Sequence, residues 1–167
     1  MFSSIAEFTG AWKQHSEATL KLFNALTDQS LTQKVGPDDR DLGRIAWHLV
    51  TTIPEMTGRL GLKADGPGES DPLPKSAGEV VKGYTALAQS LAEQIEKNWD
   101  DATLQTEDDM YGMKWRRGLT LRILIDHEIH HLGQMTVLMR QAGLKVPGLY
   151  GPAREEWEGF GMKPPEI

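Results

Sequence analysis

The chain has 167 residues, of which 39% are hydrophobic and 25% charged, as expected for one folded domain with a sizeable core. The formal net charge of −6 argues against nucleic acid as a partner, because phosphate binding needs a basic surface. The absence of cysteine excludes disulfides, thiolate metal ligands and cysteine nucleophiles. The N-terminal stretch lacks the features of a signal peptide, and no apolar run is long enough to cross a bilayer. We therefore expect a cytoplasmic protein with no membrane partner.

The first half of the chain contains two segments with the apolar spacing of amphipathic helices. In the first, residues 3–26, Ser3 or Ser4 can cap the N-terminus and Glu7 complements the helix dipole. The second, residues 40–61, follows a Gly-Pro-Asp-Asp turn. Pro54 lies inside it and is expected to kink the helix or end it early.

The second half of the chain contains two more such segments. Residues 76–99 are capped by Ser76 with Glu79 three residues on, and residues 119–139 are followed by Gly143 as a C-terminal cap. The Gly- and Pro-rich residues 62–75 predict a long crossover loop. Residues 100–117 show neither helical periodicity nor a convincing strand, and the tail from about 144 to 167 is expected to be mostly irregular, with one short helix at 152–159. The sequence therefore predicts an all-α, four-helix bundle forming a single domain over residues 1–167.

Two histidines of the fourth helix, His127 and His131, are four residues apart. At this spacing their side chains lie about 40° apart on one face and can reach the same metal ion. Leu124 and Leu138 share that face, so both histidines are expected to point into the bundle. His48 lies at the border of the core face of the second helix and can supply a third ligand. A group of three inward histidines is costly to bury without a metal ion or hydrogen-bond partners.

The other polar groups near this pair diverge from it on the helical wheel. His130 is expected to be a pocket-wall residue at best, Asp126 points away, and His15 is expected on a solvated face. The segment also matches the zinc-protease pattern H-E-x-x-H, in which Glu128 would act as the base. The downstream ligand and the substrate-aligning sheet of those enzymes are missing, so we do not favour a protease. Glu128 is instead expected to pair with Arg44 or Arg59, or to lie at a subunit interface.

The motifs IAWHLVTTIPEM, DHEIHHLGQM and YGPAREEWEGFGM resemble the DinB/YfiT-like family of metal-binding four-helix bundles over nearly the whole chain. The family pattern places its ligands at His48, His127 and His131, and here Leu132 replaces an arginine that often follows the last histidine. The resemblance implies an up-down-down-up bundle, a nickel, zinc or similar divalent ion, and a homodimer. It also implies a metal-dependent enzyme acting on a small molecule, because some relatives transfer low-molecular-weight thiols.

Three functional hypotheses follow. In the first, the metal activates an external low-molecular-weight thiol for transfer; in the second, it activates water to hydrolyse a small amide or ester. In the third, the protein is a non-enzymatic dimer with a vestigial metal site. Two interpretations remain open for the surroundings of the site. Trp115, Arg116 and Arg117 either receive an anionic thiol or form a solvated turn, and Tyr150 and Trp157 either cover the site or fasten the tail to the bundle.

Overall fold

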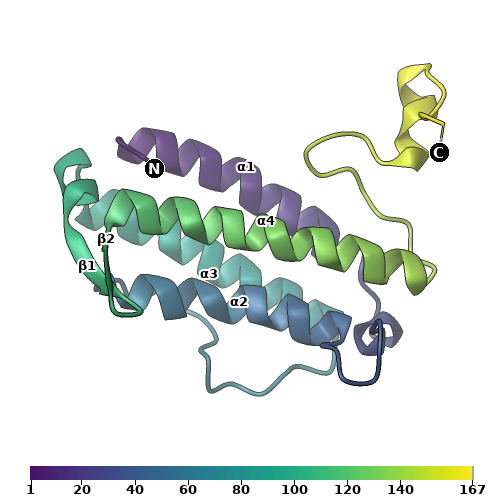
Figure 1. Cartoon of the computed structure of the whole chain (residues 1–167), viewed down its shortest axis with the longest axis horizontal. Helices are drawn as coiled ribbons and strands as arrows, with labels where there is room; N and C mark the ends of the chain where they lie inside the picture. Colours follow the sequence, from purple (N-terminus) through teal and green to yellow (C-terminus); the bar gives the residue numbers. More distant parts are fainter. Residues whose placement is uncertain (167) are drawn as a thin grey trace.

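The computed structural model describes residues 1–166 and confirms the predicted four-helix bundle. Its long helices are α1 (Ile5–Phe23), α2 (Leu42–Gly58), α3 (Ala77–Asn98) and α4 (Arg117–Gln141). In Figure 1, α1 and α4 run in one direction while α2 and α3 run in the other, which is the up-down-down-up order. The connection between α2 and α3 passes back along the outside of the bundle, since these two helices are parallel.

The capping residues explain where the helices begin. Ser4 accepts from the backbone N–H of Glu7, whose carboxylate returns to the backbone N–H of Ser4, and Ser76 caps α3 through the N–H of Glu79. Asp41 caps α2 in the same way, so this helix begins two residues later than predicted. It also ends early, at Gly58, four residues after Pro54.

A short antiparallel hairpin is the feature that the sequence did not predict. Strands β1 (Glu107–Met110) and β2 (Met113–Arg116) pair between the 3-10 turn η2 (Asp101–Gln105) and α4. Its two-residue turn, Tyr111-Gly112, has positive φ angles of 59° and 81°. With four residues in each strand, and most of these exposed, apolar alternation was too weak to reveal the hairpin.

The two ends of the bundle differ. The hairpin lies at one end, and the tail leaves the bundle at the other (Figure 1). The 3-10 turn η3 (Arg154–Phe160) of the tail is joined to the bundle by ion pairs of Glu155 with Arg140 of α4 and of Glu156 with Lys21 of α1. This turn overlaps the short helix predicted at 152–159. A further 3-10 turn, η1 (Gln29–Thr32), lies between α1 and α2. Within residues 1–166, no helix has both the length and the apolar character needed to cross a membrane.

Candidate metal centre

The three predicted ligands meet between α2 and α4, which pack against each other. His48 projects from α2, whereas His127 and His131 project from successive turns of α4. The Nε2 atom of His127 lies 3.2 Å from Nε2 of His48 and 3.2 Å from Nε2 of His131. All three side chains are partly buried, and they form a group that could hold a metal ion.

The spacing of these nitrogens fits a shared metal ion. Ligands about 2.1 Å from a tetrahedral ion lie about 3.4 Å from one another, close to the observed separation. Hydrogen bonding alone satisfies the group poorly, because a proton on the central Nε2 of His127 can serve only one of its two neighbours. An ion would accept a lone pair from each of the three nitrogens at once.

Neighbouring side chains hold two of the imidazoles in the required tautomer. Nδ1 of His131 donates to Oε1 of Gln134 at 2.7 Å, which leaves the lone pair on Nε2 facing the cluster. The amide nitrogen of Gln134 donates to Nε2 of His130 at 3.2 Å. Thr52 Oγ1 lies 3.4 Å from Nδ1 of His48, and Nδ1 of His127 has no partner within the described chain. Gln134 therefore orients the His131 ring, and the exposed His130 diverges from the pair, as predicted.

Burial keeps the three imidazoles neutral, which is the form that binds metal. It lowers the pKa of His127 to about 4, and the nearby His131 and His48 lower it further. Burial is also the main cause that lowers the pKa of His48 and that of His131. At neutral pH the group is therefore ready to bind a cation without first losing protons.

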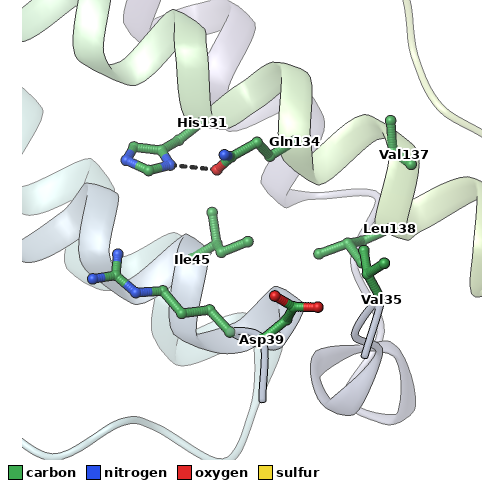
Figure 2. A pocket seen from close by; sticks show the side chains of 8 residues that line it. Val35, Asp39, Ile45, His131, Gln134, Val137 and Leu138 are labelled. Atoms are coloured by element: carbon green, nitrogen blue, oxygen red, sulfur yellow. Dashed lines mark hydrogen bonds between the residues drawn. The ribbon is translucent and has the colours of Figure 1, made fainter. Parts of the chain in front are cut away.

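The cluster opens into a large cavity on one side. This hollow of about 530 Å³ is bounded by α4, by the start of α2 and by the segment before α2 (Figure 2). His131 and Gln134 form its wall on α4, opposite Ile45 of α2. The remaining lining residues are Val35, Asp39, Arg40, Val137 and Leu138. A small molecule in this cavity would contact an apolar surface and the His131 side of the cluster.

A second hollow, of about 270 Å³, reaches the cluster from the hairpin end and touches His48 and His127. Trp115 of β2 and Tyr111 at the hairpin turn belong to its wall, which is otherwise mostly apolar. The Tyr111 hydroxyl donates to Glu55 at 2.7 Å, and Glu55 also binds Arg59 at 2.9 Å. The unpredicted hairpin thus builds part of the surroundings of the histidine cluster.

Two of the residues considered as possible thiol-binding residues lie away from the histidines. Arg117 pairs with Asp108 at 2.8 Å and lies over the Trp99 ring, while Arg116 bonds to Gln105. Neither arginine lines either hollow, so of the three residues in this group only Trp115 belongs to the site. Asp126 points away from the cluster, as predicted, and pairs with Arg122.

The prediction for His15 was wrong. Its side chain is buried, and Nε2 donates to Oε2 of Glu128 at 2.8 Å. The spacing of Trp12, His15, Thr19 and Leu22 places His15 on the core stripe of α1, a signal that its polarity obscured.

The predicted partners of Glu128 were wrong too. Glu128 is completely buried between α1 and α3, where Oε2 accepts from the Tyr84 hydroxyl at 2.7 Å as well as from His15. It contacts neither Arg44 nor Arg59, because it lies on another face of α4 from His127. A carboxylate in this position cannot serve as the base that the H-E-x-x-H pattern requires.

Tyr150 fastens the tail to the bundle. Its hydroxyl lies 2.5 Å from Nδ1 of His15 and donates to this nitrogen when Nε2 carries the proton. Burial and the charge of Glu128 raise the pKa of Tyr150 to about 12, so the hydroxyl keeps its proton at neutral pH. Neither Tyr150 nor Trp157 lines the hollows beside the histidines. Of the two open interpretations, the structure favours attachment of the tail.

A family model described as the DinB family matches residues 1–166. The chain belongs to the DinB family. It is 42% identical to the uncharacterized protein YrdA of Bacillus subtilis (strain 168) over the full length of both chains. The match to the family and to this relative therefore covers both the bundle and the tail.

Two solved DinB-like structures show the same fold. One, from Bacillus cereus ATCC 10987, is 42% identical with a TM-score of 0.87, over 90% of this chain and all of that chain. The other, YjoA from Bacillus subtilis, is 17% identical with a TM-score of 0.67, over 86% of this chain and 97% of that one. The first supports both family and fold, and the second supports the fold alone.

Proposed function

We propose that this DinB-family protein is a metal-dependent enzyme that binds one divalent ion, nickel or zinc, through His48, His127 and His131. The observation that carries the proposal is the convergence of three neutral imidazole nitrogens between two hollows. Three protein ligands with room for a further one are typical of catalytic sites, whereas structural sites use four protein ligands. A vestigial, non-enzymatic site would need no such access.

The reaction that we propose is transfer of an external low-molecular-weight thiol to a small substrate. A bound divalent ion would supply positive charge that favours the thiolate form of such a thiol. The chain has no cysteine, so the sulfur must come from a second molecule. The two hollows offer separate spaces for the thiol and its acceptor, and Gln134 keeps the lone pair of His131 directed at the centre. The resemblance to thiol transferases of the family supports the same reaction.

Hydrolysis of a small amide or ester is the second candidate. It needs a base near the metal, and the carboxylate that lines a hollow together with His48 and His127 is Glu55, not Glu128. Glu55 already accepts hydrogen bonds from the Tyr111 hydroxyl at Oε2 and from Arg59 at Oε1, so both of its oxygens are engaged away from the histidines. We therefore rank hydrolysis below thiol transfer.

Elemental analysis and a paired assay test the proposal. Purified protein should contain about one divalent ion per chain, and a protein that binds none at neutral pH would refute the metal site. Product formation from electrophilic substrates should depend on an added low-molecular-weight thiol. Equal rates with and without the thiol would instead support hydrolysis.

We also propose that the protein is a homodimer. Large apolar side chains are exposed on α4 and in the tail, among them Val137, 54% exposed, and Phe160, 62% exposed. Light scattering at several protein concentrations should give twice the chain mass. A monomer at all concentrations would refute this part of the proposal without affecting the metal site.

A further inference from the structure

The large cavity beside His131 contains an arginine without a partner. Arg40 lines this cavity, and its guanidinium makes neither an ion pair nor a hydrogen bond within residues 1–166. Arg40 and His131 line the same cavity, so the charge of Arg40 lies beside the histidine cluster. Arg40 is therefore a cation placed next to a site that is itself suited to a cation.

Arg40 is exposed to solvent, so its charge costs little by itself, but a divalent ion bound beside it would make the site attractive to an anion. Three neutral histidines leave the full charge of a divalent ion uncompensated, and Arg40 adds a further positive charge beside it. Glu55, the acid beside His48 and His127, is already shared between Arg59 and Tyr111. Asp39 lines the same cavity as Arg40 but does not pair with it. With a divalent ion bound, the net charge beside the cavity would be positive and would favour a negatively charged ligand.

The rest of the cavity limits what that ligand can be. Its remaining walls are largely apolar, with Ile45 and Leu138 facing the space between α2 and α4 (Figure 2). The volume of about 530 Å³ is within the range of small-molecule sites. Asp39 would repel a doubly charged group such as a phosphate monoester more strongly than a singly charged one. A guanidinium matches the planar fork of a carboxylate.

We infer that the cavity binds a small organic carboxylate, with Arg40 holding the carboxylate and the apolar walls holding the body of the molecule beside the metal centre. This inference rests on the proposed metal site and specifies the substrate class for it. Arg40 is a specificity-determining residue in this scheme, because it selects the charge of the ligand and does not bind the metal.

Calorimetric titration of zinc-loaded protein tests the inference with three probes of similar shape. They are 3-phenylpropanoate, its neutral amide 3-phenylpropanamide, and phenyl phosphate. Wild-type protein should bind the carboxylate at least about tenfold more tightly than the amide. In the R40Q variant this preference should fall to less than about threefold, while affinity for the amide stays unchanged.

The matched control is R44Q. Arg44 is an exposed arginine of α2, four residues along the chain, that does not line the cavity. The R44Q variant should keep the wild-type preference for the carboxylate over the amide. Wild-type protein, R40Q and R44Q should each bind one zinc ion per chain. A carboxylate affinity that survives in R40Q, or falls equally in R44Q, would overturn the role of Arg40.

The remaining outcomes separate the inference from the proposed function. Tighter binding of phenyl phosphate than of the carboxylate would overturn the assignment to carboxylates, and so would the absence of any preference over the amide. Wild-type protein that takes up no zinc would refute the metal site itself. Normal zinc uptake without charge selectivity would refute the inference alone.

Discussion

Replacing Glu128 with alanine removes a carboxylate that is completely buried and that accepts hydrogen bonds from His15 at 2.8 Å and from Tyr84 at 2.7 Å. The two donors would be left without an acceptor in a site that water does not reach, and a cavity would remain between α1, α3 and α4. Each orphaned donor costs about 1–3 kcal/mol and the cavity adds to this. E128A should therefore lose about 3–5 kcal/mol, a large fraction of the roughly 5–15 kcal/mol that stabilises a typical domain. The melting temperature of a chain of this size should fall by roughly 10 °C.

Chemical denaturation of E128A with urea gives the free energy of unfolding directly. The matched control is E96A, which removes an exposed glutamate from α3 and should change stability by no more than about 0.5 kcal/mol. Zinc content should remain at one ion per chain in both variants, because Glu128 does not face the histidines. A double-mutant cycle with Y84F should show strong non-additivity, since both substitutions remove the same hydrogen bond.

The opposite result would point to the protease-like interpretation of the H-E-x-x-H pattern. If E128A were as stable as the wild-type protein but lost activity, Glu128 would be a base at the metal and not a buried support of the bundle. A loss of less than about 1 kcal/mol would already contradict the structural role, because it is smaller than the cost of one orphaned charged hydrogen bond.

Three further predictions concern the metal centre. H127A should lose the bound ion, whereas H130A, three residues along the same helix, should retain about one ion per chain by elemental analysis; retention by both would contradict the ligand assignment. Q134L should weaken zinc binding by about 10- to 100-fold in competition with a chelator, because it removes the acceptor that orients His131; unchanged affinity would show that packing alone fixes the ring. The free energy of unfolding of metal-free protein, measured with urea, should fall by about 1–2 kcal/mol as the pH falls from 6.5 towards 4. This value allows for solvent screening of the partly exposed His127 ring. The sign follows because the pKa of His127 is about 4 in the folded chain and 6.5 as a reference value, so the unfolded chain binds more protons in this range; a midpoint that stays constant with pH would contradict it.

The features that depend on short-range periodicity and helix capping were predictable from the sequence alone. Ser4, Ser76 and Gly143 mark helix ends through local geometry, and the apolar stripes define four helices that must bury one face each. The histidine pair on α4 was equally predictable, because a four-residue spacing fixes the angle between His127 and His131 before any tertiary contact forms. His48 could be added because its helix presents it at the edge of the core.

The pairing of polar groups across the bundle depends on tertiary packing and could not be predicted. Glu128 lies on its own face of α4, but the helix pattern does not say that α1 brings His15 to that face and α3 brings Tyr84. The hairpin that places Tyr111 and Trp115 near the histidines is also invisible to periodicity, since it consists of two short, exposed strands. Arg40 lies in a connecting segment, and its relation to His131 depends on how that segment meets α4. Spacing along one helix is a local property, whereas contacts between residues far apart in the chain depend on how whole elements pack.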